Sequence, residues 1–159
     1  MNLKREGKTK TMNLWEAMRA RHSVRSYTDR RIEGETLAAL QNEIDAYNRE
    51  SGLNIQLCLN EPVAFSGLIA HYGRFRNVRN YVALVGKKVE RFEEKCGYYG
   101  ERIVLKATQL GLDTCWVAGT YRKGKAAATI GEGEKLALVI SIGYGDTHGT
   151  PSKSKSIEQ

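Results

Sequence analysis

Apolar residues recur along this chain at helical intervals in some stretches and at strand intervals in others. The longest helical pattern covers residues 33–51, and the glycine at position 52 is suited to end it. The apolar side chains that share one face of this helix are Leu37, Leu40, Ile44 and Tyr47. Shorter helices are predicted over 13–20, where Asn13 can cap the first turn, and over 98–110.

Four other stretches have the length and composition of strands. They are residues 55–59, 81–85, 114–117 and 136–142. The first alternates apolar and polar side chains, whereas the others are nearly continuous apolar runs, which is typical of strands covered on both faces. Because helices and buried strands alternate, we expect an α+β (α/β-like) fold with a mostly buried central β-sheet flanked by helices. Two short helices are expected in the remaining chain, near 67–71 and over 122–129.

Length and composition are those of a single globular unit. The chain has 159 residues, of which 41% are hydrophobic and 27% are charged. No apolar run approaches the roughly eighteen residues of a membrane span, and no signal-peptide core follows the basic N-terminus. We expect a disordered basic leader over 1–12, one domain over 13–150 and a basic C-terminal tail over 151–159.

The cysteines favour a reducing compartment. Cys58, Cys96 and Cys115 are odd in number and lack the C-x-x-C spacing of metal sites. Cys58 and Cys115 lie in predicted strands, where a thiol packs as a small hydrophobe. We therefore expect a cytoplasmic protein with no metal and no membrane partner. Since no Ser-His-Asp order or paired carboxylates support hydrolysis, any chemistry has to come from a cofactor.

The net charge of +7 is concentrated in two segments. Residues 1–11 hold four cations and one acid, which is +3, and residues 19–31 hold five cations and one acid, which is +4. Clustering of this kind also occurs in nucleic-acid-binding proteins. No basic and aromatic recognition module accompanies it here, so a nucleic-acid binder is the weaker alternative. A dianionic phosphate ligand explains the second cluster more economically.

The second cluster contains Arg21–Tyr27, with the sequence RHSVRSY. Arginine presents a planar fork of donors to phosphate oxygens, and serine hydroxyls and backbone N–H groups can complete the cradle. Taken alone, a stretch of this kind is more often a solvated surface turn. The interpretation therefore depends on what accompanies it.

Three later segments follow the Arg21 turn in order: GLDTCWVAGT at 111–120, IGYGD at 142–146 and SKSK at 152–155. In this order and spacing, the four segments resemble the flavin-dependent nitroreductase family over residues 13–157. The resemblance implies a nitroreductase-like fold, FMN as cofactor and NAD(P)H as reductant. It also implies hydride transfer through flavin N5 to a nitroaromatic, quinone or similar small-molecule electron acceptor.

The resemblance further implies which residues contact FMN, and none of their side chains is itself catalytic. Arg21 and Ser23 would lie at the phosphate and ribityl chain, and Arg25 at the pyrimidine edge, where a cation stabilises reduced flavin. Main-chain groups at Ala118 and Gly119 would lie beside N5. The remaining members of the implied set are His22, Trp116, Val117 and the basic pair Lys153 and Lys155 that returns to the phosphate.

One region departs from the family pattern. Residues 55–62 read IQLCLNEP, where most members have an Asn-x-Gln-Pro-Trp-like segment. The chain looks like a divergent branch in which one polypeptide supplies both halves of the usual homodimer, and it stops at Gln159, where the second half would begin. We expect a homodimer that buries the apolar strands and helix 98–110. The alternative is a non-catalytic flavin-binding half-domain or partner subunit.

Overall fold

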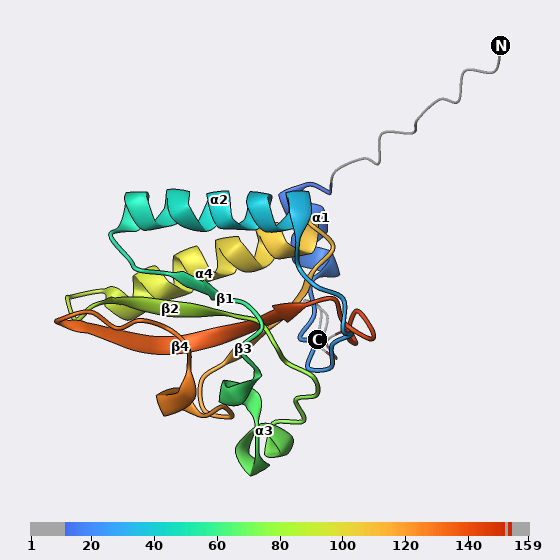
Figure 1. The fold of residues 1–159 in the computed structure, drawn as a ribbon. Coiled ribbons are helices and arrows are strands. Elements are labelled where there is room, and N and C mark those ends of the chain that lie inside the picture. Colours follow the sequence, from blue (N-terminus) through green and yellow to red (C-terminus); the bar gives the residue numbers. More distant parts are fainter. Residues whose placement is uncertain (1–11, 152, 154–159) are drawn as a thin grey trace.

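The computed structural model describes residues 12–151 and residue 153 (Figure 1). The helices are α1 (Leu14–Ala20), α2 (Gly34–Ser51), α3 (Leu68–Tyr72) and α4 (Phe92–Gln109), with 3-10 turns η1 (Pro62–Phe65) and η2 (Lys123–Lys125). The strands are β1 (Gln56–Cys58), β2 (Tyr81–Lys87), β3 (Asp113–Val117) and β4 (Glu134–Gly143). The predicted leader, except Met12, and most of the predicted tail lie outside the described residues. No helix in the described part is long and apolar enough to cross a membrane.

The four strands form one antiparallel sheet in the order β1-β2-β4-β3. The long strand β4 lies in the centre, where Ile140 pairs with Val82 on one side and with Trp116 on the other. Strand β3 is therefore an edge strand of this sheet. The predicted α+β class is confirmed, and the strand predictions agree with β1 to β4 to within a few residues.

Each face of the sheet is covered by a different kind of structure (Figure 1). Helices α2 and α4 cover one face and pack on Val82 and Leu84, whereas η1, α3 and loops cover the other face and pack on Ala83 and Val85. Every residue of 81–86 is buried within this one chain. The expectation that a second molecule is needed to bury these apolar strands is therefore wrong, because other parts of the same chain already cover both faces of the sheet.

Helix α4 begins at Phe92, six residues before the predicted start. The added N-terminal part buries Phe92 and Cys96 in the helix-covered core. Gly97 and Gly100 lie inside the helix although glycine is a poor helix former, and at Gly100 an added Cβ would lie 2.5 Å from Trp116 and 3.0 Å from Leu84. Close packing of α4 on the sheet overrides the local preference. The helix predicted over 122–129 is reduced to the short turn η2.

Candidate functional site

An open groove of about 820 Å³ lies beside the C-terminal end of α1. Pockets that hold small molecules are typically about 300–1,000 Å³. The groove is lined by the turn at 21–26 and by the segment that follows β4, and no Asp or Glu is among its lining residues. Four arginines line it: Arg19, Arg21, Arg25 and Arg74. The hollow therefore favours an anionic ligand.

The groove brings together only part of the predicted site. The four predicted residues of the basic turn, Arg21, His22, Ser23 and Arg25, all line it. Pro151 lies at its rim, and Lys153, two residues further along, is exposed. Lys155 lies outside the described residues. Residues 116–119 do not line the groove.

The basic turn is docked against the edge of the sheet. The Val24 N–H donates to the Thr114 carbonyl at 3.0 Å, and Ser23 forms a parallel bridge with Thr114. Beneath the turn, the Tyr27 hydroxyl donates to the Val24 carbonyl at 2.7 Å and lies 2.8 Å from Ser141 Oγ. Burial raises the pKa of Tyr27, so this hydroxyl stays protonated and keeps its bond. Strand β3 and the turn thus form one continuous edge.

Backbone geometry makes the rest of this edge available. In an antiparallel strand, successive residues turn their N–H and C=O groups to opposite sides. Since the Thr114 carbonyl points outward to the basic turn, the main-chain groups of Trp116 point to the same outer side. Ala118 and Gly119 are exposed. The outer edge of β3 therefore continues the line of donors that starts at the turn.

The side chains of residues 116 and 117 serve the core instead. Val117 is buried on the face opposite the helices, and half-buried Trp116 packs with the helix-covered core. The Trp116 indole N–H donates to Glu101 Oε2 at 3.0 Å. A ligand at the edge of β3 could use only the main chain of these two residues.

Sequence reasoning missed Glu101 as a member of the site. Its other oxygen, Oε1, lies 3.6 Å from Arg21 Nε, so one carboxylate holds both the indole of β3 and the first arginine of the turn. The sequence placed Glu101 in the first turn of a helix, whereas it lies in the middle of α4. Arg74 was also missed, because its place in an irregular segment carries no local signal.

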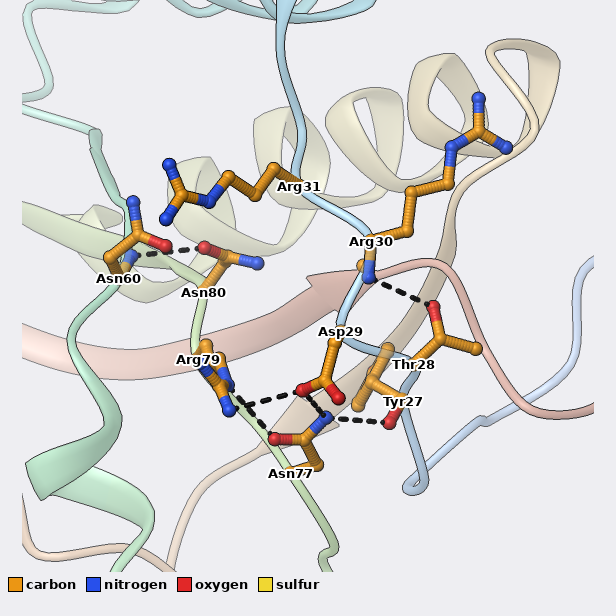
Figure 2. Close-up of a pocket in the computed structure, with 10 residues that line it drawn as sticks. Tyr27, Thr28, Asp29, Arg30, Arg31, Asn60, Asn77, Arg79 and Asn80 are labelled. Atoms are coloured by element: carbon orange, nitrogen blue, oxygen red, sulfur yellow. Dashed lines mark hydrogen bonds and ion pairs between the residues drawn. The ribbon is translucent and has the colours of Figure 1, made fainter.

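A second polar hollow lies next to the turn, and Figure 2 shows its lining residues. Its volume of about 20 Å³ is suited to a single water molecule and is too small for a cofactor. Asn77 Nδ2 donates to the Tyr27 carbonyl at 2.9 Å and to Asp29 at 3.1 Å, while Arg79 bonds Asn77 at 2.9 Å and pairs with Asp29 at 3.0 Å. This network fixes the C-terminal end of the basic turn.

Solved structures with this fold include several nitroreductases. A Desulfovibrio desulfuricans structure described as a "putative nitroreductase in complex with FMN" is 18% identical, covers 91% of this chain and 93% of that one, and has a TM-score of 0.67. An FMN-dependent nitroreductase from Clostridium difficile is 17% identical, with 89% and 91% covered and a TM-score of 0.64. These likenesses establish the fold.

A third structure differs in length. A "putative nitroreductase" from Thermotoga maritima is 21% identical with a TM-score of 0.60, and the match covers 99% of this chain but 60% of that one. No curated protein sequence matches this chain. The family model described as "Putative TM nitroreductase" matches residues 13–159, nearly the whole chain. With this match over the fold and groove described above, the chain belongs to that nitroreductase family.

Proposed function

We propose that this chain is an FMN-dependent oxidoreductase that passes hydride from NAD(P)H to electron-poor small molecules such as nitroaromatics and quinones. The observation that carries the proposal is the arginine-lined groove, together with the bonding of its basic turn to the edge strand β3. When bound, FMN would supply the redox chemistry by taking up and releasing hydride at N5. The residues of the chain would bind and orient the reactants.

The residues present fit this cofactor. Arg21 and Ser23 offer a charged fork and a hydroxyl to a phosphate, and Glu101 restrains the Arg21 side chain. Arg25 lies in the same groove with its guanidinium carbon 5.9 Å from the centre of the Phe75 ring. A cation there would stabilise the negative charge of a reduced flavin.

The strand end supplies the complementary feature. The outward N–H of Trp116 can donate to a ring heteroatom, because an edge strand leaves such groups without a strand partner, and exposed Ala118 follows at the end of the strand. A Cβ added to Gly119 would meet nothing within 4 Å, so this end of the strand has room for a planar ring. Together with the turn, it offers a phosphate-binding end and a ring-binding end.

We also propose that the protein acts as a homodimer that covers the outer face of α1. Large apolar side chains are exposed there and on α4: Leu14 (56%), Trp15 (74%), Met18 (53%) and Tyr98 (58%). A groove of about 610 Å³ runs between α1, α2 and α4, and Met18 lines both this groove and the basic one. A partner seated on α1 would therefore also reach the cofactor groove. Sedimentation showing a monomer with bound, active FMN would contradict this.

The decisive experiment is to purify the chain, add FMN and measure visible absorption, quenching of flavin fluorescence and oxidation of NADPH or NADH with menadione or a nitrofuran. We expect bound flavin and steady turnover. Failure to retain or quench FMN would overturn the proposal. Flavin binding without turnover would support the non-catalytic half-domain instead. DNA binding that weakens steeply with salt, without flavin binding, would support a nucleic-acid partner.

A further inference from the structure

Two arginines of the basic groove have no role in the proposed flavin site. Arg19 lies in the last turn of α1, and Arg74 follows α3, so they reach the groove from segments far apart in sequence. Within the described part of the chain, neither side chain forms an ion pair or a hydrogen bond. Arg21, by contrast, is held by Glu101. Both free guanidinium groups are thus available to a ligand.

Arg74 also has a backbone conformation that its residue type disfavours. Its φ is +59°, in the left-handed region, where a residue with a Cβ is about 1–2 kcal/mol less stable than in the right-handed region. Glycine would make the same turn without this cost. The turn that ends α3 requires this conformation, because the Phe75 N–H donates to the Ala70 carbonyl at 3.0 Å and the Arg74 N–H to the His71 carbonyl at 2.9 Å. Replacing Arg74 by glycine therefore removes the side chain while keeping the turn.

The groove holds more arginines than the proposed FMN contacts use. A phosphomonoester carries about −1.5 to −2 charges at pH 7, and Arg21 with Ser23 suits one such group. Arg19 and Arg74 leave a second pair of cations in the same groove. Of the two nicotinamide reductants, NADPH alone carries an additional phosphomonoester, at its adenosine 2′ position. Arginine is the residue that commonly accommodates that group.

We propose that Arg74, assisted by Arg19, binds the 2′-phosphate of NADPH and makes NADPH the preferred reductant over NADH. The inference rests on the proposed function, because it assigns the reductant of that same site. It adds a specificity that the family match does not state.

The kinetic test is Arg74→Gly in the FMN-loaded protein. We expect kcat/KM for NADPH to fall about tenfold or more, as loss of one charged hydrogen-bonding group predicts. The value for NADH and the FMN affinity should stay unchanged, and thermal stability should stay equal or rise because glycine relieves the strain. Arg74→Lys, which keeps the charge, should retain part of the NADPH preference.

Arg91→Gly is a matched control. Arg91 is also an exposed arginine with φ of +60°, but it precedes α4, whose 18 residues extend about 27 Å towards α1 (Figure 1). The Arg91→Gly substitution should leave unchanged the ratio of kcat/KM for NADPH to kcat/KM for NADH. Equal efficiency with the two reductants in the wild type, or an unchanged ratio in Arg74→Gly, would overturn the proposal.

A binding measurement provides a readout independent of turnover. In calorimetry, adenosine 2′,5′-bisphosphate should bind the wild type about tenfold or more tightly than 5′-AMP, and Arg74→Gly should remove this difference. Equal binding of the two nucleotides by the wild type would contradict the role of Arg74. If FMN itself does not bind, the proposed function fails, and the same titration on flavin-free protein still tests Arg74.

Discussion

The two ends of the proposed cofactor site are held in opposite ways. The basic turn is bonded to β3 through Thr114 and to the 76–79 segment through the network of Figure 2. At the strand end, Ala118 and Gly119 are exposed, and Tyr121 stacks on Phe65 with ring centres 6.0 Å apart. The Tyr121 hydroxyl is buried without a hydrogen-bond partner among the described residues, and burial raises its pKa to about 12.

This difference indicates a division of labour. A preorganised polar end loses little conformational freedom when a charged group binds. More of the favourable interaction free energy therefore contributes to the binding affinity. An end with free space and few bonds can admit a planar ring and adjust to it. On the proposed function, the turn supplies affinity and the strand end supplies access.

The largest expected effect is on affinity at the basic end. Arg21→Ala should weaken FMN binding about 10- to 100-fold, because a charged hydrogen bond contributes about 1.5–3 kcal/mol. Stability without FMN should fall by about 1 kcal/mol or less, since the Arg21–Glu101 pair is partly exposed. Fluorescence titration and thermal melts measure the two quantities. Arg49→Ala, which changes an exposed arginine of α2, is the control. A loss of stability as large as the loss of affinity would make Arg21 structural.

Two glycines test the contrast in packing. Gly149 has φ of +83°, and an added Cβ would lie 2.6 Å from the Cβ of His22. Gly149→Ala should therefore lower the free energy of unfolding by about 1–3 kcal/mol. Gly119→Ala meets free space and should leave stability unchanged while weakening FMN binding several-fold, if the ring lies there. Denaturant titrations of both variants, with and without FMN, measure the free energies of unfolding. A larger loss of stability in Gly119→Ala than in Gly149→Ala would contradict the prediction.

Two buried tyrosines should respond with opposite signs. Tyr27→Phe removes the hydroxyl that bonds the Val24 carbonyl and should destabilise by about 1–2 kcal/mol. Tyr121→Phe removes an unpartnered buried hydroxyl and should be neutral or stabilising by up to about 1 kcal/mol. Chemical denaturation at neutral pH measures both. Equal destabilisation by the two substitutions would show that the strand end is as firmly bonded as the turn.

The smallest effect concerns the electrostatics of the turn. Arg25→Leu should lower the flavin reduction potential by about 15–30 mV, which corresponds to roughly 1 kcal/mol for a two-electron couple. FMN affinity should change less, because Arg25 is proposed to act at the ring and not at the phosphate. Potentiometric titration of the FMN-loaded protein decides this. An unchanged potential would remove Arg25 from the role proposed for it.

Local patterns were sufficient where side-chain spacing alone decides the structure. The spacing in α2 placed Leu40, Ile44 and Tyr47 on one face, and all three are buried. The apolar run in β2 is buried on both faces as predicted. The start of α4 was predicted six residues too late because the first turns of the helix are held by burial of Phe92 and Cys96 in the helix-covered core, and those contacts are not local.

For the site, the sequence by itself determined the chemical types present: a basic turn with hydroxyls, an apolar strand that ends in Gly119, and an order of segments typical of a flavoprotein family. These are properties of short stretches, so they can be recognised in the sequence without knowledge of the fold. Only the tertiary structure joined Thr114 to the turn, set Glu101 between Arg21 and Trp116, and brought Arg74 into the groove. Such contacts depend on how distant segments close on each other, which the pattern of one segment does not encode.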